Sequence, residues 1–203
     1  MEISNQKEVW ENIAEEWNKF KTSPAEHVIK FLEGKKGKIL DLGSGSGRNL
    51  IKRGDLEYFL LDFSKKMIKF AKEKCKKLGI KANFYIQDMT KLPFEDNFFD
   101  AALCISSLHC VQGQENREKV IQELYRVLKP NTEVDVSVWN KNSYRFKNSN
   151  KERIVNWRDK GERYYYLFED KEIYNLFERN GFEIIFKEEP TRAIVFIAKK
   201  VIK

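Results

Sequence analysis

The stretch from Lys38 to Arg48, KILDLGSGSGR, decides the fold of this chain. Its first five residues form a short, largely apolar run, which is typical of a strand buried inside a sheet. Three glycines then alternate with small polar residues. Glycine permits a sharp turn and lets the backbone approach a bound molecule closely. A buried strand that leads into such a loop predicts an open α/β sheet with a ligand at the carboxyl ends of its strands.

Helices and strands alternate on both sides of this stretch. The alternation predicts an α/β fold with a mostly parallel sheet that is covered on both faces by helices. The last two apolar runs are too close together for a helical crossover and should pair as an antiparallel hairpin. We expect helices at 7–20, 23–32, 65–78, 120–129 and 169–180, and strands at 38–42, 58–62, 83–86, 101–105, 133–139, 182–186 and 194–198.

Length and charge set the domain organisation. The chain has 203 residues, of which 41% are hydrophobic, so we expect one domain over 1–203. A polar, basic insertion at about 140–163 interrupts the alternation and contains Tyr144, Phe146 and Trp157. Cations contact phosphates and aromatic rings stack on bases, so this insertion and the net charge of +7 favour an RNA partner. The alternative is a flexible surface loop on a lysine-rich protein.

The cysteines and the N-terminal stretch indicate the compartment. Cys75, Cys104 and Cys110 form no CxxC pair, which argues against a disulfide framework or a metal site and favours a reduced, cytoplasmic protein. The N-terminal stretch is acidic and amphipathic, unlike a signal peptide. No apolar run approaches the roughly 20 residues of a membrane span, so we expect no membrane association.

Acidic residues follow the expected strands at the edge where a ligand should bind. Asp62 ends the second strand about 20 residues after the glycine loop, where a carboxylate can accept both hydroxyls of a ribose. Asp88 ends the third strand beside Met89, a pair that suits the amino group and ring of adenine. A dinucleotide fingerprint would place its third glycine at position 48, which is Arg48, so NAD fits less well. Together with Asp41, this trio favours S-adenosylmethionine (SAM).

These motifs resemble the class I SAM-dependent methyltransferases. The resemblance covers Asp41–Gly47, Leu61–Ser64, Gln87–Phe94, Phe98–Asp100 and Glu123–Pro130. It implies a Rossmann-like sheet, SAM as cofactor and S-adenosylhomocysteine as product. The cofactor-binding residues that it implies are Asp41, Gly43, Ser44, Gly45, Gly47, Asp62, Phe63, Ser64, Met67, Asp88, Met89, Ile105 and Ser106.

A narrower resemblance runs over most of the chain. Val9–Trp17, Ser106–Cys110 and Arg163–Phe168 are similar to segments of the tRNA wobble-uridine methyltransferases, which esterify a carboxymethyl group at uridine 34. This chain departs from that family where two adjacent histidines are usual, because it has His109-Cys110, and in the glycine loop and at 191–193. The resemblance implies a tRNA substrate rather than DNA. It also implies a separate, small, zinc-binding activator subunit.

Four residues are candidates for handling the methyl acceptor. A carboxylate acceptor is already ionised at neutral pH, so it needs a cationic or hydrogen-bonding clamp rather than a general base. His109, Arg163, Tyr164 and Arg48 could form this clamp, although each could also be a packed or solvated side chain. Trp10 and Trp17 either cover the cofactor or pack on the core. Two other classes share these motifs, namely a small-molecule O- or N-methyltransferase and a non-catalytic scaffold that binds SAM or RNA.

Overall fold

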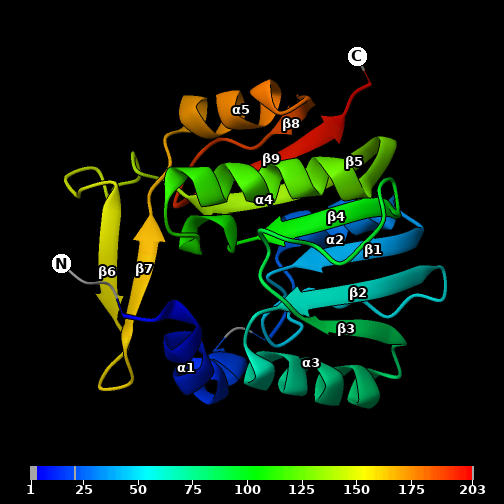
Figure 1. Ribbon diagram of the computed structural model, residues 1–203, viewed down its shortest axis with the longest axis horizontal. Coiled ribbons are helices and arrows are strands. Elements are labelled where there is room, and N and C mark those ends of the chain that lie inside the picture. Colours follow the sequence, from blue (N-terminus) through cyan, green and yellow to red (C-terminus); the bar gives the residue numbers. More distant parts are fainter. Residues whose placement is uncertain (1–3, 21, 203) are drawn as a thin grey trace.

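The main structural element is a seven-stranded sheet with the order β3-β2-β1-β4-β5-β9-β8 (Figure 1). The computed structural model describes residues 4–20 and 22–202, so the expected domain bounds of 1–203 extend slightly beyond the described residues at both ends. The strands of this sheet are β1 (Gly37–Leu42), β2 (Leu56–Asp62), β3 (Ala82–Ile86), β4 (Phe99–Ile105), β5 (Leu128–Trp139), β8 (Phe182–Lys187) and β9 (Ala193–Lys200).

The strand directions agree with the expected fold class. The pairs β1·β2, β2·β3, β1·β4 and β4·β5 are parallel, whereas β9 is antiparallel to both β5 and β8. The prediction of a mostly parallel sheet with a C-terminal antiparallel hairpin is therefore confirmed. Because β9 runs in reverse, its first residue, Ala193, pairs with the last residue of β5, Trp139. The start of β9 thus lies at the carboxyl edge of the parallel strands.

Helices cover both faces of the sheet, since alternate residues of each strand point to opposite faces. In β1, Leu40 and Leu42 belong to one hydrophobic cluster, and Ile39 belongs to another. The first cluster includes residues of α4 and α5, and the second includes residues of α2 and α3. The helices are α1 (Gln6–Phe20), α2 (Glu26–Glu33), α3 (Lys65–Leu78), α4 (Gln114–Val127) and α5 (Asp170–Arg179), with a short 3₁₀ turn, η1 (Leu108–Cys110).

Local chemistry explains where the helices begin and end. The Ser64 side chain accepts a hydrogen bond from the Met67 amide at the start of α3, and Gly79 ends that helix in the left-handed conformation, as expected. Three expected helix bounds were wrong by two residues or more, one of them the start of the fourth helix, which begins at Gln114 and not at 120. The fifth strand also begins earlier than expected, at Leu128 and not at 133. The second helix begins at Glu26 and not beside Pro24. The fourth ends at Val127, because the chain is extended at Leu128, two residues before Pro130, and a following proline disfavours helical conformation.

The basic insertion is more ordered than a flexible loop. After turns over 141–149, it forms a two-stranded antiparallel sheet of β6 (Glu152–Asn156) and β7 (Glu162–Tyr166). This hairpin stands beside α1, apart from the main sheet (Figure 1). The Gln6 side chain joins the two, because it accepts from the Tyr164 amide at 2.8 Å and donates to the Glu162 carbonyl at 3.1 Å. Within residues 4–20 and 22–202, no helix is long and apolar enough to cross a membrane.

Candidate functional site

A cleft lies at the carboxyl ends of β1, β2 and β4, beneath α1. The space within it, including the open solvent at its mouth, is about 670 Å³. An adjoining cavity shares Asp62, Phe63, Met89 and Cys110 with it and adds Asp88, so the two form one continuous cleft. Nine of the expected cofactor-binding residues line the first cavity: Gly43, Ser44, Gly45, Asp62, Phe63, Met67, Met89, Ile105 and Ser106.

Two glycines of the loop serve different purposes. Both Gly45 and Gly47 have positive φ angles, which favour glycine. A Cβ atom on Gly45 would point into open space, with the Trp17 Nε1 atom 3.9 Å away, so its absence widens the cleft. A Cβ atom on Gly47 would lie 2.9 Å from a methyl carbon of Leu50 and 3.4 Å from Ala71 of α3. The structure therefore places Gly47 in packing against α3, outside the cleft lining.

Asp62 provides a buried carboxylate at the centre of the cleft. One of its oxygens accepts from the Gly45 amide and the other from the Ser64 amide, both at 2.9 Å. Burial raises the pKa of Asp62 to about 6, and these amide bonds limit the rise. The group is therefore largely ionised at neutral pH. A carboxylate has about four acceptor sites, so each oxygen can still accept from a ligand hydroxyl.

A row of polar atoms without partners runs along the wall next to the glycine loop. Asp41 lies behind this wall and accepts from the Asn49 side-chain amide at 3.2 Å. Burial raises the pKa of Asp41 to about 7, although Asn49 and Arg48 oppose the rise. Three atoms on lining residues are buried and lack hydrogen-bond partners: Ser44 Oγ, Arg48 Nε and Asn49 Oδ1. Buried polar atoms normally have partners. Arg48 Nε is a donor, Asn49 Oδ1 is an acceptor, and the Ser44 hydroxyl can be either. Together they fit a zwitterionic ligand group, such as the amino-acid end of SAM.

The remaining expected cofactor residues occupy distinct positions. Ser64 caps α3 and does not line either cavity. Asp88 is exposed at the rim and accepts from the Thr90 amide and hydroxyl at 2.8 and 2.7 Å. Ser106 lines the cleft in a left-handed conformation, with φ 55°, which is rare for a residue with a side chain. Its amide donates to the Ser137 carbonyl at 2.9 Å, and this bond holds the strained backbone at the cleft wall.

His109 lies within an aromatic stack and not on the cleft surface. It is 1% exposed, and its ring lies 5.2 Å from that of Trp139 in a stacked arrangement. The Trp139 amide donates to His109 Nδ1 at 3.2 Å, which requires that this nitrogen carries no proton. His109 does not line either cavity, whereas its neighbour Cys110 lines both. The structure thus places His109 as a packed residue of η1.

Arg163 is buried in a cage of aromatic rings. It is 5% exposed, and its guanidinium carbon lies 4.6 Å from the centroid of Trp157 and 5.7 Å from that of Trp17. One guanidinium nitrogen donates to the Tyr165 hydroxyl at 2.6 Å, whereas Nε has no partner. Among the described residues, no carboxylate lies within ion-pair distance of this cation. Trp10 and Trp17 line the cleft and face Arg163, so Arg163 lies one layer of side chains from the cleft.

Tyr164 does not accompany Arg163, contrary to expectation. Successive residues of β7 point to opposite sides, so Arg163 pairs with Tyr165 and Tyr164 points away. The Tyr164 hydroxyl donates to Glu152 at 3.0 Å and lies 3.4 Å from an Arg117 nitrogen. The expected pair of Arg163 and Tyr164 is thus replaced by Arg163 and Tyr165.

Sequence reasoning missed several residues of the site. Asn49 lines the cleft, and its position directly after the glycine loop and Arg48 could have indicated a ligand-binding role. Tyr165 follows from Arg163 by strand alternation, but β7 itself was not among the expected strands. Glu16 of α1 accepts from Trp157 Nε1 at 2.7 Å and so fixes one wall of the cage. No pattern in the neighbouring sequence indicates this contact, because Glu16 and Trp157 are far apart in the chain.

Comparisons with known proteins show similarity to methyltransferases over part of the chain. Residues 39–131 match the family model described as a methyltransferase domain. The chain is 31% identical over 133 residues to a tRNA (carboxymethyluridine(34)-5-O)-methyltransferase of Arabidopsis thaliana, a match that covers 64% of this chain and 31% of that protein. It is 32% identical over 100 residues to the ubiquinone/menaquinone biosynthesis C-methyltransferase UbiE of Vibrio cholerae, covering 46% of this chain and 37% of the relative.

Solved structures show the same fold at lower sequence identity. A SAM-dependent methyltransferase from Methanosarcina mazei superposes with a TM-score of 0.73 at 22% identity, covering 89% of this chain and all of that chain (100%). The CcbJ methyltransferase from Streptomyces caelestis superposes with a TM-score of 0.79 at 14% identity, covering 98% of this chain and 100% of that one. At these identities the likeness concerns the fold.

Proposed function

From the premise that residues 39–131 form a methyltransferase domain on the class I, SAM-dependent methyltransferase fold, we propose that this protein methylates a carboxylate on a modified wobble uridine of tRNA. The observation that carries the proposal is the buried guanidinium of Arg163, which has aromatic neighbours and no acidic partner among the described residues. Such a cation suits an anionic acceptor. In this proposal the residues of the cleft bind the cofactor, and Arg163 in its cage positions the acceptor.

The cleft residues fit the three parts of SAM. Asp62 would accept from the ribose hydroxyls, while Asp88 and Met89 would face the adenine. Arg48 Nε would donate to the cofactor carboxylate, and Asn49 Oδ1 would accept from its ammonium group, so each buried atom gains the partner that it lacks. Bound SAM supplies an electrophilic methyl group on its sulfonium. The protein's contribution is to hold this methyl group in line with the acceptor.

Arg163 would position the acceptor. A buried charge without a partner is unfavourable, and the surrounding rings offset only part of that cost through cation–π contacts. A carboxylate from the substrate would offset the remainder through charge-assisted hydrogen bonds. Since a carboxylate with a reference pKa near 4 is already ionised, no side chain needs to remove a proton. A shift of the Trp10 and Trp17 rings would open the guanidinium to the substrate.

Support for tRNA comes from the Arabidopsis relative and from the basic charge of the chain. The match to that relative covers 64% of this chain, whereas the match to UbiE covers 46%. We also propose a cytoplasmic location, in line with the free thiols of Cys75, Cys104 and Cys110. We further propose, from the resemblance, that a small zinc-binding activator subunit associates with the protein. The edge strands β3 and β8 are where a partner strand could add to the main sheet. Copurification of such a subunit with the tagged protein would test this part.

Small-molecule methylation is the second candidate, and the similarity to UbiE favours it. Methyl transfer to carbon, to a neutral hydroxyl or to an ammonium nitrogen requires loss of a proton. The rate of such a reaction should rise with pH until the acceptor or a base is deprotonated. A carboxylate acceptor shows no such rise above neutrality, so the pH profile separates the two candidates.

The test is single-turnover transfer from labelled SAM to tRNA that bears 5-carboxymethyluridine, at saturating SAM and from about pH 7 to 9. We expect a flat rate for the wild type. Arg163→Gln should slow transfer by roughly 30- to 150-fold, the loss of a charge-assisted bond, while SAM affinity stays the same. His109→Ala tests whether the packed histidine contributes. The control is Lys171→Gln, which removes an exposed cation of α5, outside the cleft and the cage. A rate that climbs tenfold per pH unit would reject the carboxylate acceptor.

A further inference from the structure

The cations of the basic insertion fall into two groups. Three cations of its second half are paired with acids of other elements, whereas Arg153 donates to Ser149 and Arg163 lies in the aromatic cage. Lys151 binds Glu172 at 3.0 Å, and Lys160 binds Glu16 at 2.8 Å. Arg158 also binds Glu16, at 3.2 Å. These charges hold the hairpin against α1 and α5, so they are poorly placed to contact a nucleic acid.

The first half of the insertion keeps its cations unpaired with acids. Within residues 4–20 and 22–202, no ion pair joins Arg145 or Lys147 to a carboxylate, and the same holds for Arg192 in the turn between β8 and β9. Lys141 donates to the Lys147 carbonyl at 2.8 Å, which leaves its charge uncompensated. Four positive charges therefore gather on two neighbouring turns.

These two turns form the walls of a groove. Residues 142–145 line one side, and residues 190–192 line the other. Asn140 is 4% exposed and fixes both walls, because its side-chain amide donates to the Thr191 carbonyl at 2.9 Å and its side-chain oxygen accepts from the Asn142 amide at 2.8 Å. Its backbone amide also donates to the Arg192 carbonyl at 3.2 Å. The groove is thus a built feature of the fold.

Tyr144 presents an aromatic ring at the rim of this groove. It is 93% exposed, and the Lys147 ammonium lies 5.7 Å from its ring centroid. The other aromatic residues of the insertion are already engaged, since Phe146 stacks on Trp139 and Trp157 contacts Trp17. The Tyr144 ring is therefore free to stack on a nucleobase, beside the cations of the two turns.

We infer that this groove binds an unpaired strand of RNA, with a nucleobase stacked on Tyr144 and the neighbouring phosphates held by Arg145, Lys147 and Arg192. This inference rests on the proposed tRNA substrate. Stacking on aromatic rings together with phosphate contacts is how single strands are bound without sequence preference. The groove follows the end of β5 and precedes the start of β9, so it shares the carboxyl edge of the sheet with the cofactor cleft. A strand bound there can lead an adjacent nucleotide into the cleft.

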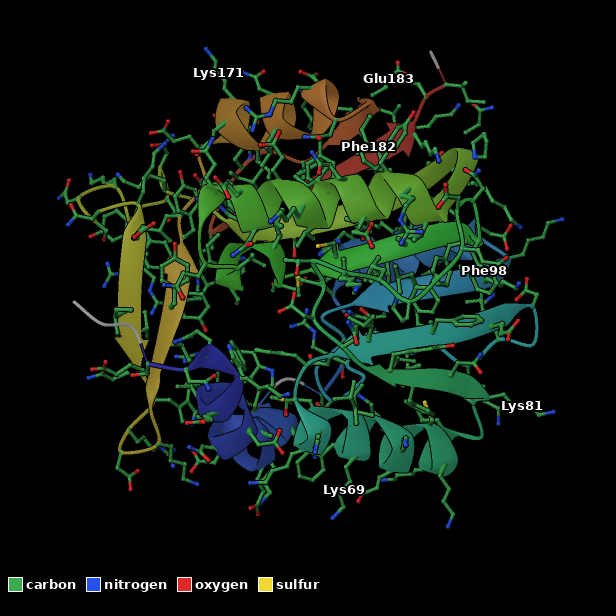
Figure 2. The ribbon with its side chains drawn as sticks, viewed as in Figure 1. Lys69, Lys81, Phe98, Lys171, Phe182 and Glu183 are labelled. Carbon is green, nitrogen blue, oxygen red and sulfur yellow. The ribbon has the colours of Figure 1, made fainter. Side chains whose placement is uncertain are left out.

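The test measures binding of a radiolabelled anticodon stem-loop RNA to the full-length protein between about 50 and 200 mM salt. Arg145→Gln/Arg192→Gln should reduce the slope of log affinity against log salt by about 1.4 to 2, which is the loss of two phosphate contacts. The matched control is Lys69→Gln/Lys81→Gln, which removes the same charge from α3 and the residue ahead of β3, on the far side of the molecule from the hairpin (Figure 2). This control should keep the wild-type slope.

Tyr144 is tested separately from the charges. Tyr144→Ala should weaken RNA binding by about tenfold, with the salt slope unchanged, and Tyr144→Phe should restore the affinity because stacking needs only the ring. Calorimetric titration with SAM should give the wild-type affinity for every variant, which shows that each is folded. Groove variants that behave like the lysine control would reject the groove while leaving the tRNA proposal intact. A wild-type protein that binds SAM and no RNA would reject both.

Discussion

At the scale of the residue, Asp62 is a buried carboxylate at the place where we propose that the ribose of SAM binds. Its carboxylate is ionised only above a pKa that burial has raised to about 6. Ribose hydroxyls donate to the ionised form, so a bound ligand should lower this pKa. SAM affinity should then fall as the pH drops through about 6. Calorimetric titration between about pH 5 and 8 measures this directly.

Substitution of Asp62 separates its ionisation from that of its neighbours. Asp62→Asn should weaken SAM binding at pH 8 by roughly 10- to 150-fold, the usual loss for hydrogen bonds to a charged group, and should remove the fall in affinity near pH 6. Asp41→Asn tests the other buried carboxylate, whose pKa is raised to about 7. Asp159→Asn, on an exposed turn, is the control. Full affinity in Asp62→Asn would remove the proposed ribose site.

Arg48 offers a second prediction at this scale. If Arg48 Nε binds the carboxylate of the cofactor, Arg48→Gln should weaken S-adenosylhomocysteine by roughly 10- to 150-fold. Binding of methylthioadenosine, which lacks the amino-acid end, should not change. Calorimetry with both ligands, and with Arg158→Gln as control, decides the matter. An equal loss for the two ligands would instead mean that the substitution disturbs the glycine loop as a whole.

At the scale of the element, α1 is held in place at two points, its first residue and Glu11 in its middle. The Glu11 carboxylate accepts from the Ser64 hydroxyl at 2.5 Å and from the Lys66 amide at 3.2 Å, at the N-terminus of α3. A negative charge is favourable there because the first amides of a helix lack partners. At the first residue of α1, the Gln6 side chain accepts from the Tyr164 amide of β7. Helix α1 therefore spans the cleft between α3 and the hairpin.

Removing this attachment should destabilise the protein. Glu11→Ala should lower the free energy of unfolding by about 1 kcal/mol, as for the loss of a helix cap. Urea denaturation measures this quantity. Glu15→Ala is the matched control, because Glu15 lies one turn further on, is 70% exposed in its side chain and pairs only with Lys19 among the described residues. Equal stabilities of the two variants would show that Glu11 does not secure α1.

The same elements show what the sequence could predict. The expected carboxyl ends of the parallel strands agree with the structure, because a polar residue or glycine stands at or directly after each end. Those ends position the cleft, so most of its lining was predictable. The hairpin of β6 and β7 was not, because its burial depends on contacts with α1, far away in the sequence. Without that strand, the side to which Tyr164 points could not be known.

At the scale of the whole molecule, the cleft joins parts of the chain that are otherwise separate. Its walls come from α1, from β1, β2 and β4, and from η1. The Arg163 cage likewise combines α1 with the hairpin. Local patterns identify each segment, but they do not reveal which rings surround a given cation, since that depends on the packing of the complete fold.

A ligand that contacts all these walls should stabilise the entire fold. At a SAM concentration of 100 times Kd, mass action adds about 2.7 kcal/mol to the free energy of unfolding. For a chain of this size, that corresponds to a rise in Tm of roughly 5–10 °C. Differential scanning calorimetry measures it, and Asp62→Asn at the same SAM concentration should show a smaller rise. An unchanged Tm in the wild type would contradict SAM binding in the cleft.

The tryptophans of this chain make it an optical reporter of its own site. Its four tryptophans are Trp10 and Trp17 in the cleft lining, Trp157 in the cage, and Trp139. Trp139 stacks on Phe146, which directly follows the groove residue Arg145. No tryptophan lies elsewhere in the molecule, so the tryptophan emission of the unlabelled protein comes entirely from this region. Single replacements by phenylalanine would separate the signal of α1 from that of Trp139. Changes in the emission of the α1 tryptophans would then report binding of the cofactor, and changes in the emission of Trp139 would report binding of RNA.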